Sequence, residues 1–105
     1  MGPGYKLYYI GRVNGRPTVS VLEPIEGAED RFTGECTIGA TPHIATPDAP
    51  LVLVPAGEGD RRATLNCRQC EATREVMLYL SRERAVKLAQ SLMANRLRRG
   101  PGREK

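Results

Sequence analysis

The sequence contains one histidine, one phenylalanine and no tryptophan among its 105 residues. A single histidine excludes sites built on two imidazoles, and it leaves little scope for general acid–base catalysis. The chain also lacks a phosphate-binding loop, a Gly-x-Ser-x-Gly motif and a dinucleotide fingerprint. We therefore expect that the protein is not an enzyme and that it acts by binding.

Long hydrophobic runs are absent as well. The run at residues 51–54, for example, is far shorter than the roughly 20 residues of a membrane-spanning helix. The first residues lack the regions of a secretory signal, and Lys6 stands where a myristoylation motif has Ser or Thr. We expect a cytoplasmic protein without membrane contact. In that compartment reduced or metal-bound thiols are more common than disulfides, and the odd number of cysteines, three, agrees.

The apolar inventory is small. We expect one domain over residues 1–99 and a flexible basic tail at 100–105. Leu, Ile, Val and Phe make up 22 residues, close to the roughly 20% below which disorder becomes common at high net charge. The net charge is +4, so a fold is expected. Gly and Pro number 11 and 8, which indicates many turns, and a small core with many turns gains from a metal or covalent cross-link.

Short apolar stretches predict the strands of a small antiparallel sheet. Beyond an N-terminal hairpin, the expected strands are residues 35–40, 51–54, 63–67 and 74–80. Residues 26–34 are expected to form a polar connection. From Ser81 the apolar spacing becomes helical and predicts one C-terminal helix over about 82–98. The fold class is therefore α+β, and for residues 71–80 the alternative is the start of a longer helix.

The N-terminal hairpin is predicted from the pair Asn14 and Gly15, which is typical of two-residue turns between strands. A two-residue loop would place Tyr9 opposite Ser20 and divide the apolar residues between the two faces. We therefore expect a three-residue loop, with Tyr9 opposite Val21 and one apolar face. In that register Val21 belongs to the core and Ser20 to the surface.

Two of the three cysteines, Cys67 and Cys70, form a Cys-x-x-Cys motif, whose short turn directs both sulfurs toward one point. Zinc needs four ligands in a tetrahedron, usually from Cys and His. The remaining cysteine and the single histidine, Cys36 and His43, complete a Cys3His set that uses every soft ligand of the chain. The pattern resembles that of zinc ribbons, although their knuckles usually carry Gly where this chain has Glu71. The resemblance covers four residues and a hairpin, and it identifies no family.

The zinc interpretation predicts a structural zinc ion, but two other interpretations of the cysteines stay open. A redox dithiol needs a thiolate stabilised by a cation or by a helix N-terminus. Arg68 would favour such a thiolate, whereas Glu71 would oppose it. Alternatively, the thiols are reduced and buried as small hydrophobic residues.

Charge is distributed unevenly along the chain. Residues 1–60 carry four basic and eight acidic side chains, whereas residues 61–105 carry twelve basic and four acidic ones. This asymmetry indicates an acidic partner, with nucleic acid first, although a solvated face without a specific partner has the same composition. The residues expected to contact nucleic acid or an acidic protein surface are Arg61, Arg62, Arg68, Arg74, Arg96, Arg98, Arg99, Arg103 and Lys105.

A second hypothesis is a protein-binding adaptor or inhibitor, of the phage or mobile-element type, that occupies the surface of a partner. Its contact would be an exposed edge of the strand within residues 5–13, where a partner's strand can pair with the sheet.

Aromatic residues suited to base stacking are scarce. Sequence-specific readout of nucleic acid is therefore not expected.

Overall fold

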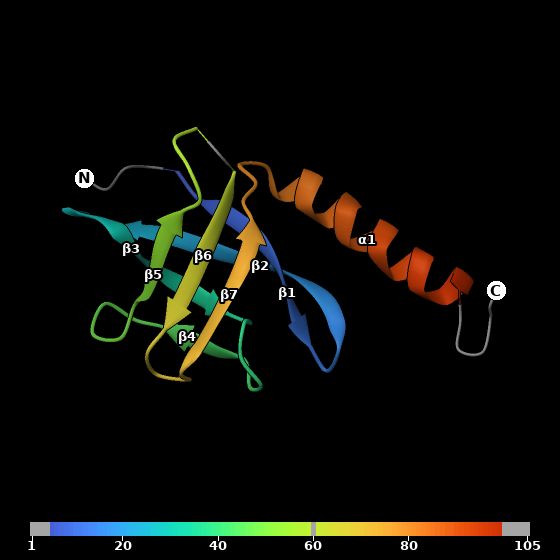
Figure 1. Cartoon of the computed structure of the whole chain (residues 1–105), viewed down its shortest axis with the longest axis horizontal. Coiled ribbons are helices and arrows are strands. Elements are labelled where there is room, and N and C mark those ends of the chain that lie inside the picture. The colour runs from blue at the N-terminus through green and yellow to red at the C-terminus, as the bar shows by residue number, and fades with distance from the viewer. Residues whose placement is uncertain (1–4, 60, 100–105) are drawn as a thin grey trace.

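A computed structural model describes residues 5–59 and 61–99, and in this part of the chain seven strands form one nearly closed antiparallel sheet followed by a helix (Figure 1). The strands are β1 (Leu7–Val13), β2 (Arg16–Ile25), β3 (Ala28–Cys36), β4 (His43–Ala45), β5 (Leu51–Pro55), β6 (Arg62–Cys67) and β7 (Ala72–Met77), and the helix is α1 (Arg82–Arg99). The predicted α+β class with a single C-terminal helix is confirmed. Residues 72–77 form a strand and not the start of a longer helix.

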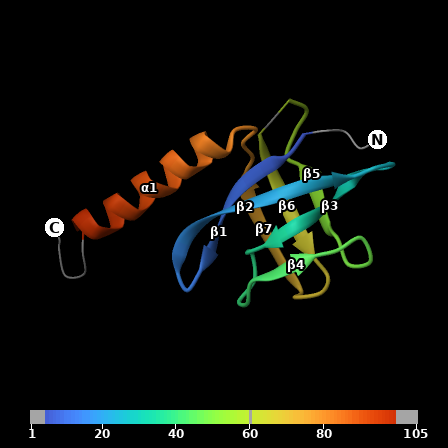
Figure 2. The ribbon, with the colours of Figure 1, turned by 180° about the vertical axis from the view of Figure 1, so that it is seen from behind.

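The sheet curves until its two ends approach each other. Its strand order is β1-β2-β3-β5-β6-β7, and β4 pairs with β3 off this path (Figure 2). The ends are joined at one point, where the backbone N–H groups of Tyr8 and Tyr79 each donate to the other residue's carbonyl at 2.8 Å. The core lies inside the curved sheet and includes Tyr9, Leu22, Phe32, Leu51, Leu65 and Val76.

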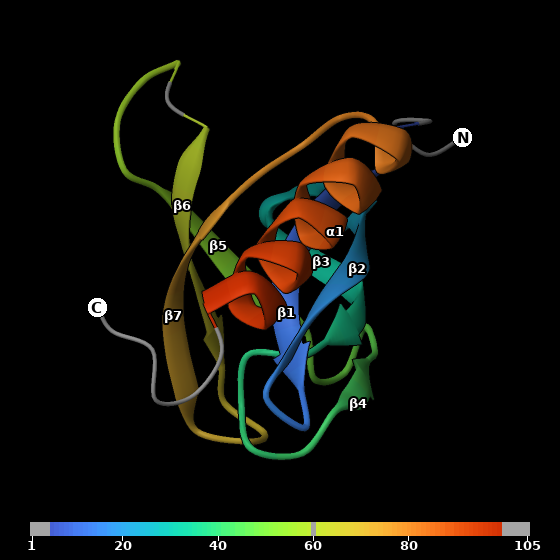
Figure 3. The same ribbon diagram turned by 90° about the vertical axis from the view of Figure 1, so that its right-hand side faces the viewer.

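The register of the N-terminal hairpin corrects the prediction. Tyr9 pairs with Ser20, so the loop has two residues, and both of them, Asn14 and Gly15, have positive φ angles of 54° and 77°. This is the turn whose twist matches that of the flanking strands. The prediction assumed that one face of the hairpin is buried. However, α1 packs against β1 and β2 from outside the sheet, so apolar residues are covered on both faces (Figure 3).

Residues 26–34 also differ from the prediction, because most of them belong to β3 and not to a polar connection. Phe32 is the one large apolar side chain of this strand and is 3% exposed, whereas residues 29–31 are all exposed. Alternation of apolar and polar residues appears where one face of a strand is buried, and the first half of β3 lies outside the core. The strand expected at 35–40 ends early, at Cys36.

Ser81 caps the N-terminus of helix α1. Ser81 Oγ accepts a hydrogen bond from the backbone N–H of Arg84 at 3.3 Å, as an N-cap does. The buried face of the helix includes Ala85, which is fully buried. Its 18 residues measure about 27 Å along the axis, so the C-terminal half extends beyond the sheet (Figure 1). Within the described residues, no helix has the length and apolar character needed to span a bilayer.

Candidate metal centre

Two hairpins bring the four predicted ligands to one end of the sheet. Cys36 ends β3 and His43 begins β4, and the two residues pair directly in the β3–β4 register. Cys67 ends β6, and Cys70 lies in the turn that leads to β7. Strand β5 connects the hairpins by pairing with β3 and with β6, where Leu51 is the partner of Cys67. The structure therefore joins residues that lie more than 30 positions apart in the sequence.

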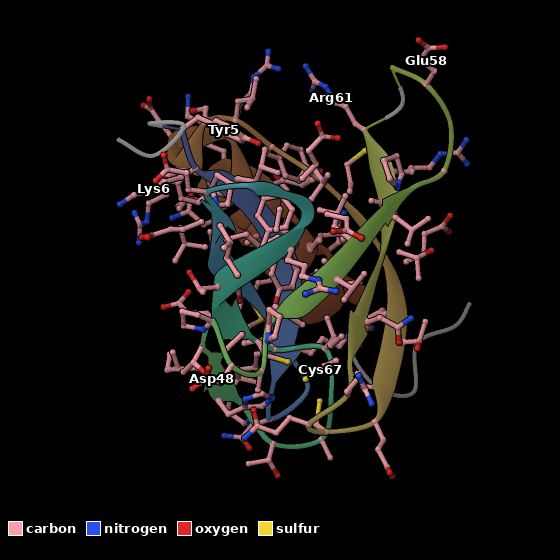
Figure 4. The ribbon with its side chains drawn as sticks, turned by 90° about the vertical axis from the view of Figure 1, so that its left-hand side faces the viewer. Tyr5, Lys6, Asp48, Glu58, Arg61 and Cys67 are labelled. Carbon is pink, nitrogen blue, oxygen red and sulfur yellow. The ribbon has the colours of Figure 1, made fainter. Side chains whose placement is uncertain are left out.

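The four candidate ligand atoms lie within 4.8 Å of one another, close enough to bind one metal ion. The Cys36 and Cys70 Sγ atoms are 3.8 Å apart, and Cys67 Sγ lies 3.4 Å from His43 Nε2. All three cysteines are free, because a disulfide would bring two sulfurs to about 2.05 Å. In Figure 4, sulfur atoms gather beside the labelled Cys67, at the end of the molecule away from Arg61.

Each thiol also receives a backbone hydrogen bond. The amide of Ile38 bonds to Cys36, the amide of Cys70 to Cys67, and the amide of Ala72 to Cys70. Backbone N–H groups directed at sulfur stabilise the thiolate, which is the form that binds metal. The loop after Cys36 and the turn after Cys67 therefore direct backbone N–H groups at the three sulfur atoms.

Glu71, which stands where zinc ribbons usually carry Gly, adopts the backbone conformation of that Gly. Glu71 has a φ of 55°, in the left-handed region that usually favours Gly. A residue with a Cβ adopts this conformation at a cost of roughly 1–2 kcal/mol. The chain thus forms the turn despite the missing Gly, and the strain indicates that the sulfur positions are held by the surrounding structure.

The three thiols differ in acidity. Burial raises the pKa of Cys36 to about 12, and burial likewise raises the pKa of Cys70. Burial acts in the same direction on Cys67, but hydrogen bonds from the Cys70 amide, from the neighbouring thiols and from His43 outweigh it and lower the pKa of Cys67 to about 7. Cys67 is thus the first of the three to become a thiolate as the pH rises.

The surroundings of the Cys-x-x-Cys motif do not match those of a redox dithiol. Thioredoxin-type motifs place the reactive thiol at the N-terminus of a helix, whose dipole stabilises the thiolate. Here Cys70 is followed by β7, a strand. The stabilisation of Cys67 comes instead from the other members of the cluster, which is the arrangement of a ligand set.

A buried hydroxyl cluster fixes the loop that follows Cys36. Tyr9 Oη donates to the carbonyl of Glu35 at 2.7 Å and accepts the backbone N–H of Thr37 at 2.9 Å. Thr37 Oγ1 lies 2.6 Å from Ser20 Oγ, and both hydroxyls are buried. Burial raises the pKa of the Tyr9 phenol, which therefore stays neutral. Because Cys36 stands between two residues anchored in this way, β1 and β2 determine the position of its sulfur.

Glycine residues that the sequence analysis missed also shape the site. A Cβ on Gly39 would lie 2.9 Å from Cys70 Sγ, so this glycine makes room for the ligand. A Cβ on Gly11 would lie 1.8 Å from Thr37 Oγ1 and 2.7 Å from the Thr37 carbonyl oxygen. The loop that follows Cys36 can therefore pack against β1 only because residue 11 has no side chain. The spacing Cys36-x-x-Gly39 is the sequence signal that could have identified Gly39, since knuckle loops often place Gly near a ligand.

The predicted basic residues do not gather at one place. Arg62 begins β6 and Arg61 directly precedes it, whereas Arg68 lies beyond the other end of β6, roughly 20 Å away at the spacing of an extended strand. Arg74 lies within β7, where its side chain is half-buried. The backbone of Arg96, Arg98 and Arg99 belongs to the end of α1, and Arg103 and Lys105 lie outside the described residues.

Comparison with known proteins gives no match to a family model, to a curated protein or to a solved structure. The functional interpretation therefore depends on the geometry of the chain itself.

Proposed function

We propose that this protein is a non-catalytic binding protein whose small fold is held together by a structural zinc ion. The observation that carries the proposal is the spacing of the four donors. Zinc bonds of about 2.3 Å to sulfur and about 2.05 Å to nitrogen give tetrahedral edges of about 3.8 Å between two sulfurs and about 3.5 Å between sulfur and nitrogen. In the cluster, the Cys36 and Cys70 Sγ atoms are 3.8 Å apart and Cys67 Sγ lies 3.4 Å from His43 Nε2, and all four donors lie within 4.8 Å of one another.

The chemistry of the donor set favours zinc and a structural role. Three thiolates and one imidazole are a common set for structural zinc, whereas magnesium and calcium prefer oxygen ligands. Catalytic zinc sites keep one position open for water or substrate. Here Cys36, His43, Cys67 and Cys70 fill all four positions, so the ion would link two hairpins and leave no position for a reaction.

Native mass spectrometry tests the metal proposal directly. Protein purified without added metal is expected to carry one zinc ion per chain, and a chelator is expected to remove it together with a rise in free thiols from zero toward three. Cobalt substituted for zinc is expected to show the intense visible absorption of a tetrahedral thiolate site. Metal-free protein after expression in zinc-supplemented medium would contradict the proposal.

We also propose nucleic acid as the acidic partner of the basic C-terminal part. The support is the excess of cations over residues 61–105, together with the exposure of Arg82, Arg84 and Lys87 on α1. Phosphate contacts of this kind provide affinity without sequence readout. The dispersed positions of the arginines fit such contacts better than a single base-reading face.

The dependence of binding on salt tests this partner. Each phosphate neutralised on duplex DNA contributes about −0.9 to the slope of log affinity against log salt concentration, and we expect a total slope of roughly −2 to −4. Deleting residues 100–105 removes Arg103 and Lys105, so the slope should become shallower by up to about two while the melting curve stays unchanged. Random duplex DNA titrated across a salt series measures both. Absence of binding near 50 mM salt would eliminate nucleic acid as the partner.

A further inference from the structure

The sheet is left open along most of the line where β1 meets β7. Tyr8 and Tyr79 form an isolated bridge at one end of this line. Continued antiparallel pairing from that bridge would place Ile10 opposite Met77 and Arg12 opposite Glu75. Among the described residues neither pair forms, and the backbone N–H of Arg12 donates instead to the carbonyl of Thr37 at 3.0 Å. We call the space between Ile10–Arg12 and Arg74–Met77 the seam.

The hydrogen-bonding direction of β7 shows what the seam exposes. The N–H of Leu78 donates to the carbonyl of Arg61, on the β6 side, whereas Tyr79 bonds with Tyr8 on the opposite side. Because backbone groups alternate along a strand, Glu75 and Met77 point their N–H and carbonyl groups toward the seam, as Tyr79 does. Within the described residues these groups pair with no strand on that side. They form an open edge that can accept an added strand.

A groove of about 250 Å³ occupies the seam. Its walls are β1 and β7, and α1 contributes Leu88 and Leu92. Three large apolar side chains of the groove are exposed, namely Met77 at 42%, Leu92 at 40% and Leu88 at 38%. In Figure 3, α1 lies in front of β1, with β7 beside it. Clustering of such side chains in one groove, and not singly over the surface, marks an interaction site.

Arg74 indicates which charge a molecule bound in the groove should carry. Its side chain lines the groove, is half-buried, and lies on the same face of β7 as the buried Val76. Within the described residues it makes no ion pair and no hydrogen bond. Arg12 lines the groove too, and Glu75 is its one acidic residue, so the groove is net positive. A partly buried guanidinium without a partner favours a ligand that carries a carboxylate.

We infer that the seam binds an extended peptide segment of a partner protein, which adds as a strand to β7, places apolar side chains against Leu88 and Leu92, and directs one acidic side chain to Arg74. At the seam the open backbone edge favours a peptide over nucleic acid, because a peptide supplies complementary N–H and carbonyl groups at the spacing of a strand and nucleic acid does not. The inference concerns a surface separate from the zinc cluster and does not depend on it.

The test is a selection with random peptides about ten residues long, the upper length of an ordinary strand, displayed on phage against the immobilised full-length protein with its metal bound. Enriched peptides are expected to alternate apolar and polar residues and to share one Asp or Glu. Each is then synthesised unchanged, with the acidic residue replaced by its amide, and with either of the two alternating sets of backbone nitrogens methylated. Only one set faces β7, and methylation of that set removes the N–H donors of the added strand without altering the protein.

Three measurements decide the outcome. Arg74→Gln should weaken the acidic peptide about tenfold or more and leave the amide form unchanged, whereas Arg31→Gln, the same change at an exposed residue of β3, should alter neither. Methylation of one alternating set of nitrogens should abolish binding, and methylation of the other set should have a smaller effect. No enrichment, equal binding of the two methylated forms, or equal effects of the two arginine variants would overturn the inference. So would displacement of the peptide by duplex DNA in an Arg74-dependent manner, or a dimer of the protein that dissociates in Arg74→Gln.

Discussion

Removal of the metal, or the substitution Cys67→Ser, is expected to unfold the protein. Binding of structural zinc to small domains contributes roughly 10–16 kcal/mol, and the whole stability of a domain is about 5–15 kcal/mol. Cys67 is buried, and its sulfur lies 3.4 Å from His43 Nε2, so a serine there removes a candidate ligand with only a small loss of side-chain volume. Circular dichroism should show a loss of sheet signal at 25 °C, together with loss of zinc in native mass spectra.

A matched substitution separates the metal from the turn. Gln69→Ser changes an exposed residue between the two cysteines, without touching a ligand, and should keep both the zinc and the melting curve. If chelator leaves the melting curve of the wild-type protein unchanged, the cysteines are reduced structural residues and the zinc proposal is wrong. Loss of fold in Gln69→Ser would show instead that the turn itself is the sensitive element.

The four clustered residues could be predicted because the sequence offers few soft donors. Cys-x-x-Cys directs two sulfurs together, and Cys36 and His43 were the remaining candidates, so elimination named the four residues that the fold assembles. The scaffold of the site could not be predicted in the same way. Tyr9 and Thr37 meet because β1 crosses the Cys36 loop, and this contact depends on the curvature of the whole sheet.

The fold class was predictable from periodicity, whereas the closure of the sheet was not. The helical spacing after Ser81 located α1 correctly, since an amphipathic helix carries its pattern within its own sequence. The hairpin register depended on a partner outside the hairpin. In β1, Tyr9 faces the core, whereas Tyr8 and Ile10 face outward, so the strand has no single apolar face. The apolar residues on the outer face are explained by α1, which covers that side of the hairpin.

The second hypothesis, a protein-binding adaptor with an exposed edge strand, also depended on how the sheet closes. The sequence placed an exposed edge on β1, but the structure uses that edge at Tyr8 and at Arg12. The open backbone groups that remain belong mainly to β7, at Glu75 and Met77. The strand addition that we propose therefore uses β7, at the other end of the sheet order.

The corrected register leads to an expected result with a large effect: Ser20→Asp should destabilise the protein far more than Val21→Asp. Ser20 is 1% exposed, and its Oγ lies 2.6 Å from Thr37 Oγ1 inside the sheet. A carboxylate at this position would be buried without a cation, which costs roughly 3–5 kcal/mol. In a domain of this size that loss lowers the melting temperature by about 15 °C or more.

Val21→Asp is the informative comparison, because the two positions are adjacent and receive the same new charge. Val21 is half-buried on the outer face of β2, where water can solvate part of a carboxylate, and a loss of roughly 1–2 kcal/mol is expected. Arg16→Asp, at an exposed position of the same strand, controls for the charge alone and should be nearly silent. Melting curves of the three variants at neutral pH measure the order directly. Greater damage from Val21→Asp than from Ser20→Asp would require the three-residue loop and contradict the pairing of Tyr9 with Ser20.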